Sequence, residues 1–501
     1  MSGVETRLRR EVDGEVLFDA ASRGRYSTDA SIYQIEPVGV VVPRTEEAAR
    51  AAFAIAVEHG VPLLPRGAGT SQCGQTVGAA LVIDDSKYLK RVIEVAPERR
   101  TAIVQPGVVL DSLNAQLRKH GLWFPVDVST SAQATLGGMA GNNSCGSRSI
   151  AYGNMVHNVL AIDALTAGGE RWRFGPMSGP TAEAGPPAYV ELVRKLRALY
   201  EREEAEIAAR FPAVLRKVAG YNLDHLGPPQ ANTAHLLVGS EGTLAWFERL
   251  HLKLAPLPPA RALGVCHFPK FYTAMDCAQH IVKLGPSAVE LVDRTMIDLA
   301  REIGAFRSTV EAFIRGEPDA ILLVEFSGED TAEQQRKLKQ LEQLMGDIGL
   351  PGSVVEVTDA KQQRDLWEVR KAGLNIMMSM KGDGKPVSFI EDCAVPLEHL
   401  AEYTERLTQV FEKHGTRGTW YAHASVGCLH VRPVLDMRRE GAQQMRAIAE
   451  EACALVRQYK GAYSGEHGDG LARSEWIAPL FGPRLTAALG EIKSWLDPKG
   501  L

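Results

Sequence analysis

The sequence predicts a protein of the α+β class with two or three domains. A chain of 501 residues is longer than one ordinary hydrophobic core can serve. Strand-like apolar runs alternate with helix-like periodic segments in both halves. The organisation changes after the proline-rich stretch LAPLPPARAL, around residue 255. We expect an N-terminal arm, two domains and a C-terminal segment, at residues 1–33, 34–255, 256–455 and 456–501.

In the first half, helices and strands are expected in turn. Residues 45–60 carry a Thr cap, two early Glu residues and an apolar stripe before a terminal Gly, which predicts a helix. A second helix is expected at 108–121. Ala167-Gly168-Gly169 should form the turn of a hairpin. The expected strands carry the sequences VPLLP, ALVID, TAIVQPG, NVLAIDALT and ERWRF.

The second half repeats strand-helix-strand units. This pattern favours an α+β domain with helices on one face of a sheet. The expected strands are 262–268, 288–293, 320–328, 353–358 and 388–396. The expected helices are 273–285, 331–349, 397–415 and 441–459.

Composition excludes several classes of function. The formal charge of −5 and the pI near 6.3, with dispersed Lys and Arg, argue against a nucleic-acid partner. The start lacks the apolar stretch of a signal peptide, and no run of 18 or more apolar residues follows, so we expect a cytoplasmic protein. Seven cysteines form no CxxC pair, which argues against a disulfide framework, a zinc finger or iron-sulfur ligands.

The stretch HASVGCLHVRP, residues 423–433, contains two histidines seven positions apart. A helix would separate them by about 10 Å along its axis, and one straight strand would send them to opposite faces. A reversal at Ser425-Val426-Gly427 would aim both rings at one point, and Gly427 permits it. We therefore expect a hairpin that brings His423 and His430 together. Its second arm places Arg432 on the face of His430.

The loop RGAGTSQCG, residues 66–74, is expected to bind an anion. Gln75 and Thr76 stand where a Walker loop needs Lys and Ser/Thr. The loop leads into a strand rather than a helix, so it is not a Rossmann fingerprint. Its glycines would let backbone N–H groups converge on an anion beside Arg66 and the hydroxyls of Thr70 and Ser71.

Three stretches together resemble the FAD-binding domain of the vanillyl-alcohol-oxidase (PCMH) type, over about residues 34–255. They are PLLPRGAGTSQCGQ, TLGGMAGNNSCGSRSIAYGNMVHNVLAIDALTAGGE and LLVGSEGTLAWFERLHLKL. The resemblance implies noncovalent FAD, because no histidine lies near Thr70, where tethered relatives carry one. It places the pyrophosphate on Arg66, Gly67, Ala68, Gly69, Thr70 and Ser71. It lines the flavin with Gly137, Gly138, Gly141, Asn142, Ser144, Gly146, Gly153 and Val159, and closes over it with 239–242, which include Glu241 and Gly242.

From about residue 255 the chain is similar to FAD-linked D-2-hydroxyacid dehydrogenases, a group with D-lactate, glycolate-oxidase-subunit and D-2-hydroxyglutarate members. The similar pieces are AVELVD, LWEVRKAG, HASVGCLH and SGEHGDGLARSEW. The resemblance implies a ferredoxin-like α+β substrate (cap) domain and a C-terminal segment that returns to the flavin site. It also implies a divalent metal, taken as zinc, bound by His423, His430 and Glu466. Such a donor set leaves an open position for substrate.

Three cations are candidate ligands of substrate carboxylates. By the resemblance, Arg370 and Lys385 hold the distal carboxylate of hydroxyglutarate, but Leu374 replaces the hydroxyl residue that is usual there. Arg432 stands where Asn is usual and adds positive charge beside His430. Because these charges exceed the need of one carboxylate, we expect a dicarboxylate such as D-2-hydroxyglutarate to be preferred over D-lactate.

The expected reaction is oxidation of a D-2-hydroxy acid to the 2-oxo acid, with hydride passing to flavin N5. His467, next to Glu466, is the expected base, kept neutral by the nearby cation. Its rival is His235, interpreted as a strand histidine. The alternatives are a D-lactate or glycolate dehydrogenase subunit, an oxidase of alcohols or sugars, and a non-catalytic flavin electron-transfer subunit.

The electron acceptor is left open among an iron-sulfur region or subunit, an electron-transfer flavoprotein and a quinone. Relatives continue past the position of WLDPKGL, and some forms carry a C-terminal iron-sulfur region. The sequence is therefore expected to be part of a longer polypeptide or to rely on a separate partner. Peripheral membrane association through that acceptor and a homodimer are also left open.

Overall fold

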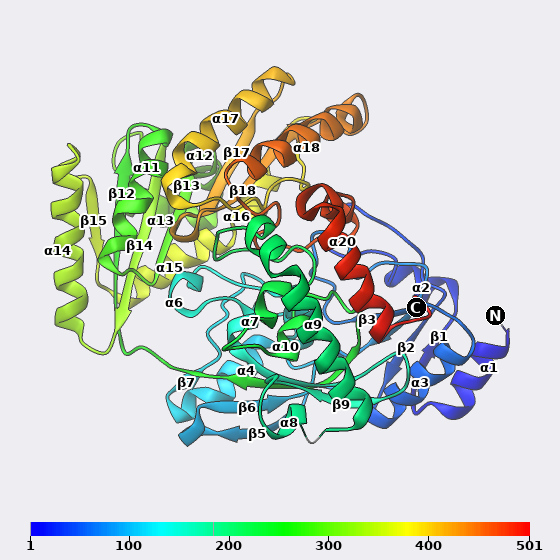
Figure 1. The fold of residues 1–501 in the computed structure, drawn as a ribbon. Coiled ribbons are helices and arrows are strands. Elements are labelled where there is room, and N and C mark those ends of the chain that lie inside the picture. Colours follow the sequence, from blue (N-terminus) through cyan, green and yellow to red (C-terminus); the bar gives the residue numbers. More distant parts are fainter. Residues whose placement is uncertain (1, 184) are drawn as a thin grey trace.

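Two sheets form the first half of the chain in the computed structural model, which describes residues 2–183 and 185–501 (Figure 1). Their orders are β1-β2-β4-β3 and β5-β6-β10-β8-β9. The first sheet contains β1 (Gly14–Leu17), β2 (Gly39–Pro43), β3 (Leu63–Arg66) and β4 (Leu81–Asp84). The second contains β5 (Val92–Ala96), β6 (Thr101–Val104), β8 (Val159–Leu165), β9 (Arg171–Phe174) and β10 (Trp246–Lys253). A two-stranded pair joins β7 (Leu122–Trp123) to β11 (Ala255–Pro256).

Helices cover these two sheets. They are α1 (Ser2–Glu11), α2 (Ala20–Arg25), α3 (Glu46–Glu58), α4 (Leu110–Leu117), α5 (Leu136–Asn142), α6 (Ser149–Tyr152), α7 (Met155–Asn158), α8 (Pro180–Glu183), α9 (Pro187–Arg210) and α10 (Thr233–Leu237). The Thr45 hydroxyl caps α3 by accepting from the Ala48 N–H, as the sequence predicts. The residues expected as an arm contain α1 and β1, and β1 pairs with β2 in the first sheet.

The second half contains a ferredoxin-like unit. Its order along the chain is β12 (Ala260–Phe268), α11 (Phe271–Ile281), β13 (Ala288–Asp293), β14 (Ala320–Gly328), α14 (Thr331–Asp347) and β15 (Val354–Val357). In space the strands run β15-β12-β14-β13, all antiparallel. The sheet continues through β17 (Gly418–His423) and β18 (Cys428–Leu435) to β16 (Lys385–Pro386). The hairpin expected at residues 423–433 is therefore confirmed, and its two strands extend over residues 418–435.

Both faces of this sheet are covered, so the expectation of helices on one face only is wrong. Leu322 and Val324 of β14 pack on one side against α11, α14, α17 (Leu400–Lys413) and α18 (Gly441–Gln458). Ile321 and Leu323 pack on the other side. The helices there are α12 (Arg294–Glu302), α13 (Gly304–Phe313), α15 (Ala360–Lys371) and α16 (Gly373–Met378). Consecutive apolar residues of one strand point to opposite faces, so both faces of the sheet are apolar and buried.

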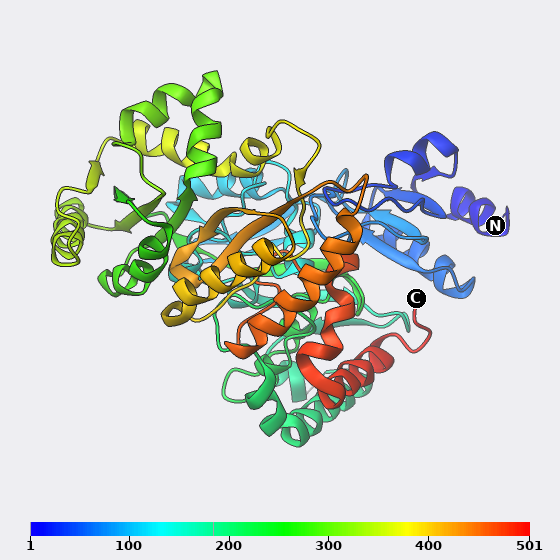
Figure 2. The ribbon, with the colours of Figure 1, turned by 90° about the horizontal axis from the view of Figure 1, so that it is seen from above.

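The end of the chain returns to the first half. After α18 come α19 (Gly470–Arg473) and α20 (Ile477–Leu496), and α20 lies along α9 in Figures 1 and 2. Phe481, Leu485 and Ile492 join the core of the second sheet. The loop between α18 and α19 therefore spans both halves. The division at residues 33, 255 and 455 stays a prediction.

Two local expectations are wrong. Residues 388–396 form no strand, because Glu391 and Asp392 bond to a distant turn and the backbone there is irregular. His235 lies in helix α10 rather than a strand.

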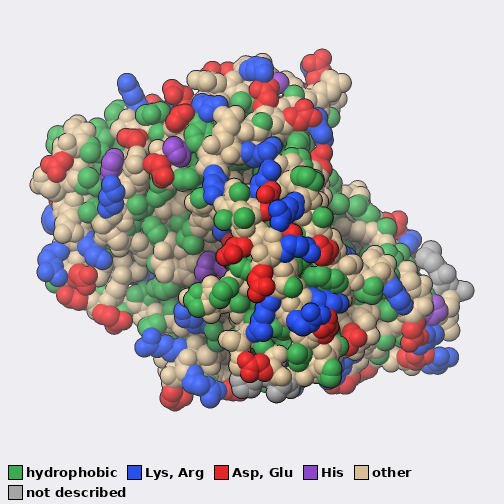
Figure 3. Space-filling view, in the orientation of Figure 1, with side chains coloured by type: hydrophobic (Ala, Val, Ile, Leu, Met, Phe, Trp, Pro, Cys, Tyr) green, Lys and Arg blue, Asp and Glu red, His purple; other side chains and the backbone are tan. Residues whose placement is uncertain are grey.

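Acidic and basic side chains are interspersed over the face shown in Figure 3. Within the described ranges, no helix is both long and apolar enough to cross a membrane.

Candidate active site

A groove lies between the two sheets of the first half and contains half of the predicted flavin residues. They are Arg66, Gly67, Gly137, Gly138, Gly141, Asn142, Glu241 and Gly242. Further lining comes from Pro65, Gln75, Thr76, Asp85, Pro106, Thr135, Ala245 and Phe247.

The glycines of this groove fit a bound cofactor. A Cβ at Gly141 would meet nothing nearer than the Gly242 nitrogen at 4.0 Å, so it would occupy the groove itself. At Gly67 a Cβ would lie 2.1 Å from the Thr135 hydroxyl oxygen, and at Gly137 it would lie 2.5 Å from Pro106. Glycine is therefore required for close backbone packing at two positions and leaves space open at a third.

The other predicted flavin residues lie off this lining: Ala68, Gly69, Thr70, Ser71, Ser144, Gly146, Gly153 and Val159. The Ser71 hydroxyl accepts from the N–H groups of Cys73 and Gln75, and the Ser144 hydroxyl accepts from Asn142. A Cβ at Gly146 would clash with the Asp127 backbone, so this glycine serves packing. The roles of all eight toward FAD stay predictions.

Arg66 is already held by carbonyl groups. Its guanidinium donates to the carbonyls of Tyr26, Thr28 and Thr76 at 2.7–3.2 Å. Burial lowers the pKa of Arg66, although the nearby carboxylates of Asp29 and Asp84 oppose this. The side chain therefore stiffens the loop as well as adding positive charge at the groove.

The 418–435 hairpin brings the two predicted histidines together. Gly427 has φ +65°, and a Cβ there would lie 2.0 Å from the Val395 carbonyl oxygen, so glycine is needed at the reversal. Tyr421 pairs with His430 across the strands, and His423 follows on the same face. The centroids of the two imidazole rings are 4.8 Å apart. The geometry expected for HASVGCLHVRP is confirmed.

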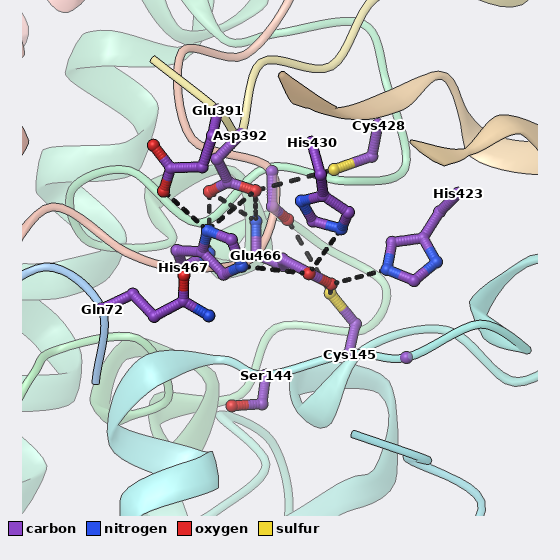
Figure 4. A network of polar contacts seen from close by, with 12 residues as sticks. Gln72, Ser144, Cys145, Glu391, Asp392, His423, Cys428, His430, Glu466 and His467 are labelled. Atoms are coloured by element: carbon purple, nitrogen blue, oxygen red, sulfur yellow. Dashed lines mark hydrogen bonds and ion pairs between the residues drawn. The ribbon is translucent and has the colours of Figure 1, made fainter. Parts of the chain in front are cut away.

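The Glu466 carboxylate lies between three imidazole rings (Figure 4). Its Oε2 is 3.3 Å from His423 Nε2, and its Oε1 is 3.0 Å from His430 Nε2. His467 Nε2 lies 3.3 Å from the same Oε1. Two imidazole nitrogens and a carboxylate suit zinc, so the three predicted ligands fit a divalent cation.

The donor atoms that lie within 4.8 Å of one another belong to Asp392, His430, Glu466 and His467, a group that differs from the predicted ligands by leaving out His423. Asp392 also holds the backbone of this cluster. Its carboxylate accepts from the N–H groups of Glu466 at 3.0 Å and His467 at 2.7 Å. It also accepts from the Ser464 hydroxyl at 2.6 Å. With these donors on its oxygens, Asp392 serves as the frame of the 464–467 turn rather than as an open ligand.

The charges in the cluster shift its pKa values strongly. Burial would raise the pKa of Glu466, but His423, His430 and Arg216 hold it well below its ordinary value. Burial lowers the pKa of His430 to about 4. Burial would also lower the pKa of His467, but Asp392, Glu391 and Glu466 outweigh it and raise the pKa to about 10. These carboxylates oppose the neutrality expected for His467 at pH 7, and a cation bound beside it would lower its pKa.

The three candidate substrate cations differ in their partners. Arg370 Nη2 lies 2.5 Å from Glu290 Oε2 in a buried ion pair. Lys385 is exposed and donates to the Met380 carbonyl. Arg432 is fully buried.

The partners of the Arg432 guanidinium are all neutral. It donates to the Ser388 hydroxyl, the Tyr421 hydroxyl and the Gln72 side-chain oxygen at 2.8–2.9 Å. No described residue forms an ion pair with it, although its charge helps to lower the pKa of Glu391. A buried cation without a direct counter-charge is costly, and an anionic ligand would relieve that cost.

Groove and cluster are joined by hydrogen bonds. Asn142 Nδ2 donates to the Glu466 carbonyl at 2.7 Å, and Gln75 Nε2 donates to the His467 carbonyl at 3.1 Å. The Glu241 carboxylate accepts from the Asp469 and Gly470 N–H groups. The GEHGDG loop therefore borders the predicted flavin groove directly.

Sequence reasoning missed several charged residues of the cluster. Arg216 is fully buried and donates to Glu466 Oε2, the Cys145 sulfur and the Ser149 hydroxyl. Glu290 carried a usable signal, because it interrupts the apolar run at the centre of the strand AVELVD, whose six residues are all buried. Glu391 carried a similar signal in SFIEDCAVP. Arg216 lies in a loop with no pattern to mark it.

Comparison with known families agrees with this arrangement. Residues 37–175 match the family described as "FAD binding domain", and residues 257–501 match "FAD linked oxidases, C-terminal domain". The chain belongs to the FAD-linked oxidases. As a member of this family it carries an FAD-binding domain and a C-terminal domain that contains all three predicted metal ligands.

Individual relatives narrow the comparison. The chain is 33% identical over 522 residues to "D-2-hydroxyglutarate dehydrogenase" from Pantoea ananatis. The matched region covers 99% of this chain and 50% of that protein. The chain is 26% identical to "Glycolate oxidase subunit GlcD" from Bacillus subtilis, and the matched region covers 98% of this chain and 94% of that protein. It thus spans about half the length of the first relative.

Solved structures show the fold. The structure of p-cresol methylhydroxylase with substrate bound superposes with a TM-score of 0.73, covering 99% of this chain and 95% of that one, at 14% identity. The vanillyl-alcohol-oxidase (PCMH) type of fold, predicted from the sequence, is confirmed.

Proposed function

We propose that this protein oxidises a D-2-hydroxy acid, with D-2-hydroxyglutarate as the best candidate, to the 2-oxo acid in an FAD-dependent and metal-assisted reaction. One observation carries the proposal. The turn that bears Glu466 and His467 is hydrogen-bonded to the groove residues Asn142 and Gln75. The donor set for a cation thus borders the groove that fits FAD.

The chain's residues divide the work in this proposal. FAD supplies the hydride acceptor at N5, and a divalent cation, proposed to be zinc, lowers the pKa of the substrate hydroxyl. His423, His430 and Glu466 hold the cation. His467 takes the hydroxyl proton, because its ring stacks on His430 with centroids 5.1 Å apart and its Nε2 faces Glu466.

The proposed substrate site centres on Arg432. Buried beside His430 and without an ionic partner among the described residues, it suits the C1 carboxylate of a 2-hydroxy acid. The ion pair between Arg370 and Glu290 weighs against Arg370 as a carboxylate ligand. Lys385 then serves the distal carboxylate of a dicarboxylate substrate.

A monocarboxylate is the second candidate. Only one of the three cations considered, Arg432, is both buried and without an acidic partner. This favours D-lactate or glycolate, and the similarity to a glycolate oxidase subunit points the same way. The similarity to D-2-hydroxyglutarate dehydrogenases favours the dicarboxylate.

Electrons are proposed to leave the flavin for an iron-sulfur region or subunit, an electron-transfer flavoprotein or a quinone. The homodimer and the peripheral membrane association stay predictions.

Anaerobic flavin reduction tests the function. The FAD-loaded protein is mixed with glycolate and with D- and L-forms of 2-hydroxyglutarate and lactate, and flavin absorbance is followed. D-2-hydroxyglutarate should reduce it fastest at limiting concentration, and faster reduction by D-lactate would reverse the choice of substrate. Reduction by none of them would overturn the function.

Substitution of the cations tests the substrate site. Arg432→Met should raise the half-saturating concentration of every substrate about 10- to 100-fold, because a charge-assisted hydrogen bond contributes about 1.5–3 kcal/mol. Lys385→Met, the matched control, should affect only 2-hydroxyglutarate. An unchanged half-saturating concentration in Arg432→Met would remove Arg432 from the site.

A further inference from the structure

Two buried glutamates occupy matching positions on either side of Glu466. Glu290 Oε1 lies 2.8 Å from His423 Nδ1, and Glu391 Oε1 lies 2.9 Å from His467 Nδ1. Both carboxylates are fully buried. Each is also paired with a buried arginine: Glu290 with Arg370 at 2.5 Å, and Glu391 with Arg473 at 2.6 Å.

These contacts determine which way each imidazole points. A ring whose Nδ1–H donates to a carboxylate leaves Nε2 to act as ligand or base. The Nε2 atoms of His423 and His467 each lie 3.3 Å from a carboxylate oxygen of Glu466. The strands and loops that supply the two glutamates are about 100 residues apart in sequence, so the likeness arises in the folded structure alone.

The two arrangements differ in one respect. Glu290 accepts a hydrogen bond from His423 at Oε1, and its Oε2 lies in an ion pair with Arg370 without a hydrogen-bond partner among the described residues. Glu391 uses Oε1 for both His467 and Arg473, and its Oε2 has no hydrogen-bond partner among the described residues. Glu391 is therefore held by two hydrogen bonds, and Glu290 by one hydrogen bond and one ion pair.

We propose that Glu290 is a positioning residue that sets metal affinity by holding His423 with Nε2 toward the ion, and that Arg370 is the fixed counter-charge of Glu290. Glu391 and Arg473 do the same for His467, which faces substrate and is not a ligand. The inference rests on the proposed function, in which His423, His430 and Glu466 hold the cation. It gives Arg370 a role other than substrate binding.

Zinc titration of matched variants tests the proposal. Holoprotein with FAD is stripped with a chelator and titrated with Zn²⁺ against a chromophoric competitor. Glu290→Gln should weaken Zn²⁺ binding about 10- to 100-fold, the usual loss when a partner of a ligating histidine is removed. Glu391→Gln, the matched control, should bind Zn²⁺ as wild type does.

A second pair of variants guards against misfolding. Glu290→Gln leaves Arg370 buried without a counter-charge, so the protein can lose stability for that reason alone. Glu290→Gln combined with Arg370→Met removes both charges, and it should keep the loss of Zn²⁺ affinity while FAD content stays at the wild-type level. Arg370→Met alone should bind Zn²⁺ close to wild type, because Glu290 still reaches His423.

The outcomes separate this inference from the proposed function. Wild-type protein that binds no Zn²⁺ would overturn both. Zn²⁺ binding that is normal in wild type and equally normal in both Glu290→Gln variants would overturn the positioning role alone. An equal loss in Glu391→Gln would make His467 a ligand and overturn the division between the two glutamates.

Discussion

The flavin groove and the charged cluster around Glu466 are built on opposite principles. The groove is lined mostly by small residues, and the glycines of α5 lie within five consecutive positions, 137–141. The cluster is made of long charged side chains from distant segments: Arg216, Glu290, Glu391, the 418–435 hairpin and Glu466. The groove therefore depends on small residues that leave space for a ligand. The cluster depends on opposite charges that neutralise one another.

This contrast means that each region should fail separately. The contacts between them run mainly through main-chain groups of the 466–470 loop, which bond to Asn142, Gln75 and Glu241. A side chain lost from the cluster should leave FAD in place. A side chain added to the groove should leave the metal in place.

The largest expected effect breaks the cluster. His430→Ala removes one of three proposed ligands, and metal affinity should fall by more than the roughly 100-fold that loss of an outer partner causes. Flavin reduction should fall at least as far as when the base is lost, about 10²- to 10⁴-fold. Metal analysis and stopped-flow reduction measure both. His235→Ala in α10, the matched control, should keep its metal, and full activity in His430→Ala would refute the site.

A second substitution separates ligand from base inside the cluster. His467→Asn should slow flavin reduction about 10²- to 10⁴-fold while FAD and metal stay bound. The reduction rate and the metal content are measured on the same preparation. A near-native rate would mean that another group takes the proton, and lost metal would mean that His467 is a ligand.

The two regions also differ in how far the sequence reveals them. The groove follows from glycine-rich motifs that are local in the chain, and the ferredoxin-like unit follows from strand and helix periodicity. The hairpin at 418–435 could be derived because only a reversal joins His423 to His430. In each case the information lies within a few dozen neighbouring residues.

The rest of the cluster depends on tertiary contacts that no local pattern encodes. Glu391 and Asp392 lie in a segment that looks like a strand, but their bonds to His467 and to the 464–467 turn impose an irregular backbone. His235 sits in a run of small and apolar residues too short for periodicity to separate helix from strand. The pairing of Arg370 with Glu290 joins residues 80 positions apart.

An added side chain in the groove should give the reverse pattern of losses. Gly141→Val places two methyl groups in the open space, and overpacking costs about 1–3 kcal/mol, so FAD should bind about 10- to 100-fold more weakly. Metal content should not change. Gly346→Val in α14, where a Cβ meets nothing within 4 Å, is the control.

The same preparations test how the flavin is held. Wild-type protein should release intact FAD on acid denaturation, because no histidine lies near Thr70 to tether the flavin. Flavin that stays with the precipitate would contradict noncovalent binding, and equal FAD affinity in Gly141→Val and wild type would place the cofactor elsewhere.

The smallest expected effect concerns the border between the two regions, where Asp469 of the GEHGDG loop lies near Glu241 of the groove. Burial and the Glu241 charge raise the pKa of Asp469 from 3.8 to about 8. A carboxyl whose pKa is raised on folding stabilises the folded protein fully below its unfolded pKa and loses that contribution as pH rises through its folded pKa. Between pH 4 and 8, wild-type protein should therefore lose stability relative to Asp469→Asn, which stays neutral and keeps an oxygen to accept the Gly220 N–H. Thermal unfolding across this range should show Tm curves that diverge by about 2–4 °C for each kcal/mol, whereas parallel curves would mean that Asp469 does not titrate there.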